Sequence, residues 1–251
     1  MMTQELWPGG PQFSDNQEGF RTGTDSLLLA DFGKRLYKKG NKRIADLGCG
    51  AGLISIILAL GDPEITIDGI EVLTGEARMA EENILACGLH SRVRIIEDDL
   101  RRHRGSLPAG AYDAVISNPP YYTEGSGKSP STNEKAVAKS GILCTFDDVC
   151  KAAGYLVRFG GPFIFIHKPE MLSMIFHILS DNGFEPKIMR FVHHKLSSPP
   201  SLVLMESRRG GKPSLRIEAP LILTNDNGAD SDELAAIYSR IPGQFGITLK
   251  P

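Results

Sequence analysis

The amino-acid sequence predicts an α/β fold built on a doubly wound, mostly parallel sheet of seven strands that ends in an antiparallel hairpin. From Arg43 onward, short apolar runs alternate with longer helical segments, which is typical of a parallel sheet with crossover helices. Two further runs near the end of the chain are separated only by a turn-forming stretch with Ser-Ser-Pro-Pro, which favours a hairpin. A chain of 251 residues, 41% of them hydrophobic, can bury a full core in one domain.

The expected elements follow one another in a regular order. We expect strands at residues 43–47, 65–71, 92–97, 112–117 and 162–167, and helices at residues 53–60, 74–87, 146–158 and 170–182. Thr74 is expected to be an N-cap, and Gly88 and Gly183 lie just past helix ends. The hairpin pairs residues 188–193 with 202–207, and the polar stretch 124–133 is expected to be a mobile loop.

Composition argues against several classes of protein. No apolar run approaches the roughly 20 residues of a membrane span, and the first ten residues lack signal-peptide features, so we expect a cytoplasmic protein. The four cysteines form no C-x-x-C pair, which indicates neither a disulfide framework nor a structural metal. The net charge of −2 argues against a protein that coats nucleic acid, so RNA contacts must come from local basic patches.

A glycine-rich turn follows the first expected strand. In the segment D-L-G-C-G-A-G, Asp46 stands two residues before Gly48, and Gly50 and Gly52 follow. A parallel sheet binds ligands at this edge, and glycines let the backbone approach a ligand closely. The spacing differs from the dinucleotide pattern G-x-G-x-x-G, which disfavours a nicotinamide dehydrogenase. The alternative is a turn that serves only to join strand and helix.

Acidic residues end the next two strands. Glu71 follows the glycine turn by about 20 residues, where a carboxylate can accept both hydroxyls of a ribose. Asp98 and Asp99 follow the third strand, where one acid could accept an adenine amino group; the motif alignment favours Asp99, with Asp98 as its rival. Each acid alone could simply be solvated, but three such motifs in order on successive strand ends are more specific than any one.

The strand at residues 112–117 runs directly into the sequence N-P-P-Y. Proline fixes φ and has no N–H, so the side-chain oxygen of Asn118 and the carbonyl of Pro119 form a rigid pair of acceptors. Tyr121 offers a ring face to a planar base. A reaction at a delocalised amino nitrogen needs such acceptors and alignment more than a strong base. A proline-stiffened loop with no chemical role is the alternative.

These motifs together resemble the N-P-P-Y amino methyltransferases, and specifically the bacterial tRNA(Val) adenine-37 N6-methyltransferase family. The resemblance covers about residues 15 to 223 and includes the segments 19–29, 46–52, 118–122, 185–187, 190–192 and 211–213 with Glu71 and Asp99. It implies a Rossmann-like class I methyltransferase fold, S-adenosylmethionine as cofactor, and N6 methylation of the adenine beside the anticodon. Lys139-Ser140-Gly141 depart from a basic-His-acid run that related sequences often carry.

The resemblance also implies residue roles and an organisation of the chain. The cofactor would be held by Thr24, Asp25, Asp46, Gly48, Gly50, Gly52, Glu71, Asp99 and Asn118, and catalysis would rest on Asn118, Pro119 and Tyr121. Asp25 could equally cap a helix that extends to Leu36. Residues 1–42 would be a cofactor lid, 43–223 the methyltransferase domain and 224–251 a tail.

Basic clusters are candidates for contacts with tRNA, although each could be an ordinary solvated face. They comprise Lys34, Arg35, Lys38, Lys39, Lys42 and Arg43; Arg101, Arg102 and Arg104; and Arg208, Arg209 and Lys212. His193 and His194 lack the pattern of a metal site, and His167 on an apolar strand is expected to be a core or edge histidine.

Other activities stay open at this stage. Glutamine N5-methyltransferases of the release-factor type share N-P-P-Y but typically carry a helical domain before the glycine turn, where this chain has 45 residues. Methylation of DNA adenine or rRNA guanine fits the same motif. A non-catalytic S-adenosylmethionine-binding protein that interacts with RNA is an alternative of another class, which the intact Asn118 and Tyr121 disfavour.

Overall fold

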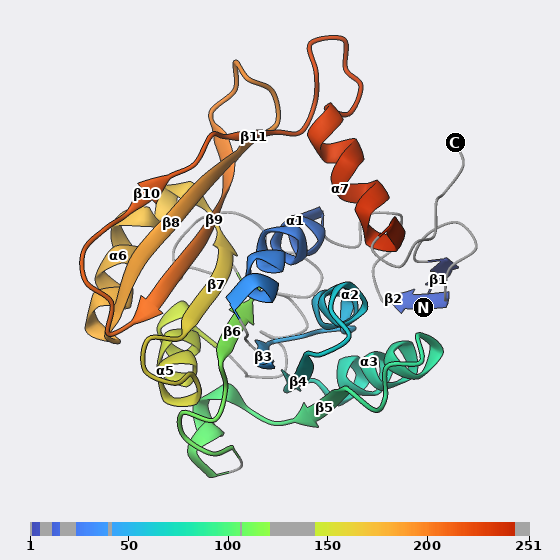
Figure 1. The fold of residues 1–251 in the computed structure, drawn as a ribbon, viewed down its shortest axis with the longest axis vertical. Coiled ribbons are helices and arrows are strands. Elements are labelled where there is room, and N and C mark those ends of the chain that lie inside the picture. Colours follow the sequence, from blue (N-terminus) through green and yellow to red (C-terminus); the bar gives the residue numbers. More distant parts are fainter. Residues whose placement is uncertain are drawn as a thin grey trace.

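The computed structural model describes residues 2–5, 12–15, 24–39, 42–105, 107–120 and 144–243 (Figure 1). A row of seven strands runs through the molecule in the order β5-β4-β3-β6-β7-β9-β8. β9 is antiparallel to both of its neighbours, and the other pairs between β5 and β7 are parallel. The predicted mostly parallel sheet with a C-terminal antiparallel hairpin is therefore confirmed. The strands are β3 (Arg43–Leu47), β4 (Thr66–Glu71), β5 (Val93–Glu97), β6 (Ala114–Ser117), β7 (Pro162–His167), β8 (Phe184–His193) and β9 (Pro200–Arg209).

Two very short strands widen this sheet beyond the seven that were expected. β10 (Arg216–Ile217) and β11 (Leu221–Ile222) both pair in parallel with β8. A strand of two residues has no alternation of apolar and polar positions that the sequence could reveal. The central sheet thus has nine strands in all within the described part of the chain.

Helices cover both faces of the sheet. Figure 1 shows α1, α2 and α7 on one side and α5 and α6 on the other. Alternate residues of a strand point to opposite faces, and β7 illustrates this: Ile164 and Ile166 join the core under α1 and α2, whereas Phe163 and Phe165 join the core under α5 and α6. The helices are α1 (Thr24–Gly33), α2 (Leu53–Gly61), α3 (Thr74–Ala86), α5 (Phe146–Leu156), α6 (Leu172–Asp181) and α7 (Asp232–Gly243), with 3-10 turns η1 (Lys34–Lys39), η2 (Leu100–Gly105) and η3 (Pro169–Met171).

Three details of the predicted helices are wrong. Leu73, not Thr74, is the N-cap of α3, because the Thr74 hydroxyl donates to Oε1 of Glu97 at 2.6 Å instead of capping the helix. α5 ends at Leu156 because Val157 is extended and forms a bridge with Tyr112. Asp25 is the second residue of α1 and not its cap, and the segment after Gly33 continues as the 3-10 turn η1.

A hairpin near the N-terminus docks on α3 through one amide side chain. β1 (Met2–Glu5) pairs with β2 (Gln12–Asp15). Asn83 is buried on α3; its Oδ1 accepts from the Ser14 N–H at 2.7 Å and its Nδ2 donates to the Ser14 carbonyl at 2.9 Å. The same Nδ2 donates to the carbonyl of Ala51 in the glycine turn at 2.9 Å. Asn83 therefore joins the hairpin to the candidate site.

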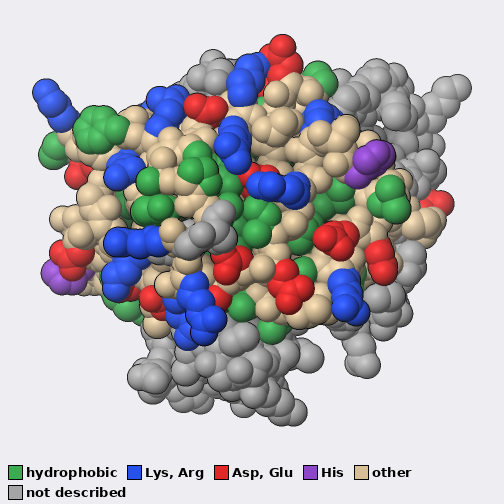
Figure 2. All heavy atoms as spheres, turned by 90° about the horizontal axis from the view of Figure 1, so that it is seen from below, with side chains coloured by type: hydrophobic (Ala, Val, Ile, Leu, Met, Phe, Trp, Pro, Cys, Tyr) green, Lys and Arg blue, Asp and Glu red, His purple; other side chains and the backbone are tan. Residues whose placement is uncertain are grey.

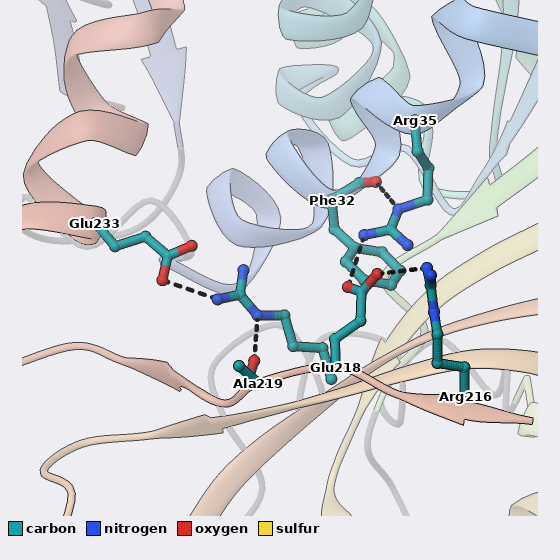
Figure 3. Close-up of polar contacts among 7 residues, drawn as sticks. Phe32, Arg35, Arg216, Glu218, Ala219 and Glu233 are labelled. Atoms are coloured by element: carbon teal, nitrogen blue, oxygen red, sulfur yellow. Dashed lines mark hydrogen bonds and ion pairs between the residues drawn. The ribbon is translucent and has the colours of Figure 1, made fainter.

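The segment after β9 is fastened to the rest of the fold by ion pairs, which Figure 3 draws. Glu218 pairs with Arg35 at 3.2 Å and with Arg216 at 3.0 Å, and Glu233 at the start of α7 pairs with Arg190 at 2.8 Å. α7 was not predicted, yet its Leu234 and Ile237 are buried in the same core as α1 and α2. No helix of the described residues is long and apolar enough to cross a membrane.

Candidate active site

The predicted site residues converge at the carboxyl ends of four neighbouring strands. The parallel register sets Leu47 beside Ser117 and Ile70, and Glu71 beside Glu97. The glycine turn after β3, the acids after β4 and β5 and the Asn118-Pro119 step after β6 therefore share one edge of the sheet. An open parallel sheet binds its ligand in the crevice outside such an edge.

The glycine turn adopts a backbone that other residues rarely tolerate. Gly48, Gly50 and Gly52 have φ angles of 69°, 52° and 87°. Among the described residues beyond its chain neighbours, a Cβ at Gly48 or Gly50 would meet no atom within 4 Å, whereas one at Gly52 would lie 3.3 Å from the Cβ of Ala80. The first two glycines thus leave open space over the turn, and the third lets α3 pack closely. The sequence prediction of close backbone approach fits this geometry.

Glu71 holds the glycine turn in place. Its Oε2 accepts from the Gly50 N–H at 2.9 Å, and its Oε1 accepts from the N–H groups of Val72 and Leu73, each at 2.9 Å. Burial raises the pKa of this carboxyl, and the three N–H donors oppose that shift by favouring the charged form. The side chain lies where a ribose-binding acid was predicted, and that role stays a prediction.

Asp46 has a buried carboxyl oxygen that a ligand could satisfy. It is fully buried, and its Oδ2 accepts from the Ser55 hydroxyl at 2.7 Å. Its Oδ1 is buried without a hydrogen-bond partner in the described part of the chain. Burial raises the pKa of the Asp46 carboxyl to about 7, the Ser55 hydrogen bond opposes this, and the charge of Glu71 raises it further. An orphaned carboxylate oxygen beside an open glycine turn fits a ligand with an N–H donor or a cationic amine, such as the amino-acid end of S-adenosylmethionine.

The two adjacent acids after β5 have different environments. Asp99 accepts from Arg101 in a two-pronged ion pair, with 2.6 Å between its Oδ2 and Nη2 of Arg101, and this hydrogen bonding holds the pKa of Asp99 below its usual range. Asp98 accepts from the Asp99 N–H at 2.8 Å, and its own N–H donates to the Glu71 carbonyl. The preference for Asp99 over Asp98 as the adenine-binding acid stays a prediction.

Asn118 has a partner that the sequence did not reveal. Its Nδ2 lies 3.1 Å from the hydroxyl of Ser26, on α1. The strand before it is anchored because the Ser117 hydroxyl donates to the Leu47 carbonyl at 2.7 Å, while Pro119 is buried. Ser55 is the single polar residue of the apolar helix α2, which was an available signal for it. Ser26 stands directly after Thr24 and Asp25 in the first turn of α1, where nothing in the sequence distinguishes it.

Several predicted positions lie outside the described residues. They include residues 19–23 of the segment 19–29, Tyr121 and Tyr122, the loop 124–133, the departure at Lys139-Ser140-Gly141 and residues 244–251 of the expected tail. Thr24 and Asp25 are described, and they form the first turn of α1 beside Ser26. Their expected role in closing the cofactor pocket stays a prediction.

His167 is a buried residue at the end of the apolar strand β7. Burial lowers its pKa to about 4, and its Nδ1 accepts from the Lys168 N–H at 2.8 Å. It is therefore a neutral core histidine, as expected. His193 contacts the Ser198 carbonyl, and among the described residues no group of side chains could hold a metal ion.

Many cations of the predicted basic clusters are paired with acids. Figure 2 shows Lys and Arg side chains interspersed with Asp and Glu over one face, without one extended basic surface. Such pairing reduces the positive potential available to phosphates. The pairs are Lys34–Asp31, Arg35–Glu218, Lys42–Glu64, Arg43–Asp68, Arg101–Asp99 and Arg208–Glu206.

The strand order, the antiparallel strand β9 in the described central sheet and the glycine turn at the carboxyl edge define a class I methyltransferase, and comparison with known proteins agrees. A protein described as a predicted O-methyltransferase from Agrobacterium tumefaciens has the same fold, with a TM-score of 0.68 and 21% identity over 87% of this chain and 97% of that one. This likeness concerns the fold alone.

The chain belongs to the Methyltransferase small domain family, whose model matches residues 16–142, and it is an S-adenosylmethionine-dependent methyltransferase. A relative from Tolumonas auensis, named tRNA1(Val) (adenine(37)-N6)-methyltransferase, is 30% identical over 90% of this chain and 92% of its own length. A relative of the same name from Aeromonas hydrophila is 29% identical over 76% of this chain and 77% of its own length.

Proposed function

We propose that this protein methylates the N6 nitrogen of an adenine in tRNA, with adenine 37 of tRNA(Val) as its target. The observation that carries the proposal is the Asn118-Pro119 step: it follows β6, whose last residue Ser117 pairs with Leu47 at the end of β3, directly before the glycine turn. The names of relatives that align over most of the chain support the choice of substrate. We also propose that the protein acts in the cytoplasm, where tRNA is modified.

The target chemistry explains why acceptors stand at this position. The lone pair of an exocyclic amine is delocalised into the ring, so the nitrogen must rehybridise before it can attack a methyl group. S-adenosylmethionine supplies an electrophilic methyl on a sulfonium. The side-chain oxygen of Asn118 and the carbonyl of Pro119 would each accept one amino hydrogen, which draws the lone pair out of conjugation and points it along the line of transfer.

Transfer of this kind places little demand on a base. The N–C bond forms as the S–C bond breaks, and the amino nitrogen releases its extra proton afterwards, when it has become strongly acidic. The neutral, buried His167 at the neighbouring strand end is not required for the step. The chain's own residues therefore act by position and hydrogen bonding.

RNA must present the base in an accessible form. A base in a single-stranded loop can leave its stack at a cost of a few kcal/mol at most, which favours a loop such as the anticodon loop over a paired stem. Because several cations of the basic clusters are already paired, we expect modest, salt-sensitive tRNA affinity rather than tight general binding to nucleic acid.

The test is methyl transfer from labelled S-adenosylmethionine to unmodified total tRNA, followed by nucleoside analysis. The proposal predicts N6-methyladenosine with the wild type and none with Asn118→Ala, which loses the acceptor for the target amino group. Most of the cofactor affinity is expected to remain in this variant, because the glycine turn, Asp46 and Glu71 are unchanged. Exposed Asn227→Ala, in a distant turn, serves as the matched control. Transfer to protein glutamine or DNA but not to tRNA would overturn the substrate, and loss of cofactor binding in Asn118→Ala would overturn the role of that residue.

A further inference from the structure

The candidate catalytic amide of Asn118 is tied to a helix far away in sequence. The Ser26 hydroxyl lies 3.1 Å from Nδ2 of Asn118, although 92 residues separate the two. Both side chains are partly buried, so the contact is shielded from much of the solvent. The contact involves the residue to which the proposed reaction assigns the target amino group, so it can affect the reaction as well as the stability of the fold.

The packing of α1 against the core restricts how far Ser26 can move relative to Asn118. Leu28, Leu29 and Ala30 bury almost all of their surface in the core, which leaves the helix little freedom to shift. At the other end of α1, a Cβ on Gly33 would lie 3.0 Å from Cδ1 of Ile116, so the missing side chain lets the helix approach β6 closely. Ser26 is thereby held at a set distance from the residue that follows β6.

Because a carboxamide is asymmetric, the contact with Ser26 can determine which end of the Asn118 side chain faces the substrate. Asn has a donor end and an acceptor end, and rotation by half a turn exchanges them. When the Ser26 oxygen accepts from Nδ2, the acceptor end of the amide is directed elsewhere. The proposed reaction needs that acceptor end toward the amino group, since an NH2 presented to the substrate would repel its hydrogens.

We propose that Ser26 is a positioning residue that orients the Asn118 carboxamide, with Nδ2 held by the serine oxygen and Oδ1 presented to the target amino group. This proposal rests on the proposed reaction at Asn118. Ser26 does not touch the reacting atoms, so its removal slows the chemical step and leaves the binding of both substrates largely intact.

The kinetic test compares Ser26→Ala and Ser26→Thr with the wild type on unmodified tRNA. Ser26→Ala is expected to lower kcat by about tenfold with little change in the KM for tRNA or the Kd for S-adenosylmethionine, and Ser26→Thr, which restores a hydroxyl, is expected to recover most of kcat. Ser239→Ala removes an exposed helical hydroxyl on α7 and should leave kcat unchanged. A kcat unaffected by Ser26→Ala, or lowered equally by Ala and Thr, would overturn the proposal.

A second readout is independent of the substrate. In the 15N-labelled, ligand-free protein, the side-chain amide signal of Asn118, assigned from its loss in Asn118→Ala, should shift and exchange faster in Ser26→Ala and stay near its original position in Ser26→Thr. An Asn118 amide signal identical in all three proteins would refute the contact itself. Absence of methyl transfer by the wild type, with the amide contact intact, would instead refute the proposed function.

Discussion

Asp46 and Glu71 are two buried carboxylates at the same edge of the sheet, and they differ in how far the protein satisfies them. Glu71 accepts three backbone N–H groups and thereby builds the glycine turn. Asp46 accepts one hydroxyl, from Ser55, and keeps a buried oxygen without a partner among the described residues. The first carboxylate therefore shapes the site, whereas the second is suited to receive a donor from a ligand.

Glu71→Ala should weaken cofactor binding before it affects the chemical step. The substitution removes the acceptor for the Gly50 N–H as well as the expected acceptor for the ribose, so we expect the Kd for S-adenosylmethionine to rise by at least about tenfold, with kcat at saturating cofactor much less affected. Titration calorimetry and initial rates measure the two quantities. Glu81→Ala, exposed on α3, is the matched control. An unchanged Kd in Glu71→Ala would contradict the role of this residue.

The raised pKa of Asp46 predicts how the stability of the ligand-free protein depends on pH. Burial raises the pKa of the folded Asp46 carboxyl from its usual 3.8 to about 7, so the folded state binds the proton more tightly than the unfolded state does. The stability difference that favours the protonated form is fully present below pH about 4 and is lost as pH rises through about 7. Asp46→Asn, which cannot ionise, should therefore become progressively more stable relative to the wild type between those pH values.

Denaturant unfolding of both proteins from pH 5 to pH 8 measures this difference. His167, with its lowered pKa, contributes a pH dependence of the opposite sign, but it does so in both proteins and cancels in the comparison. A difference in unfolding free energy that stays constant over this range would show that Asp46 is ionised throughout.

At the scale of elements, the best predictions fall on strands that are buried on both faces. The expected ranges 43–47 and 162–167 coincide with β3 and β7, because continuous apolar runs bounded by turn residues leave little choice. α7 escaped prediction although Leu234, Ile237 and Ile241 recur at helical spacing. The hairpin β1–β2 offers few apolar residues, and the burial of its Phe13 depends on distant partners. Long-range contacts of this kind are not encoded in local periodicity.

Asn83 is the element-scale link between the N-terminal hairpin and the cofactor turn. Asn83→Leu keeps the volume but leaves the N–H and the carbonyl of Ser14 and the carbonyl of Ala51 without their partner, so we expect a loss of stability on the order of 2 kcal/mol and weaker cofactor binding. Denaturant unfolding and titration calorimetry measure both, and Glu82→Leu on the exposed face of α3 is the control. If Asn83→Leu lost stability without any change in cofactor affinity, the coupling of hairpin and turn would be disproved.

At the scale of the whole molecule, two described helices that are far apart in the sequence, α1 and α7, pack in the same layer. α1, which precedes the glycine turn, and α7, near the C-terminus, are buried in one core with α2, and the ion pairs of Arg35 and Arg190 bind the segment between β10 and α7 to that layer (Figure 3). We therefore propose that the residues described between 24 and 39 and between 224 and 243 stabilise the methyltransferase domain directly, in addition to any role as lid or tail.

The sequence predicted the strand-end positions of the candidate site but not their supporting contacts. Asp46, Glu71 and Asn118 follow directly from motifs at strand ends, and the parallel sheet brings them to one edge. Ser26 and Ser55 could not be assigned because a serine within an apolar helix carries no indication of the partner it will meet. The register of helices against the sheet decides those partners, and that register is a property of the folded core.

The most direct test of the central claim uses one defined RNA and one altered nucleotide. An unmodified tRNA(Val) transcript and the same transcript with guanine in place of adenine 37 are incubated with the wild-type protein and labelled S-adenosylmethionine, and the labelled position is mapped by nuclease digestion and nucleoside analysis. We expect N6-methyladenosine at position 37 of the first transcript and no label in the second. Equal labelling of both transcripts, or labelling of neither by a protein that binds the cofactor, would contradict the account.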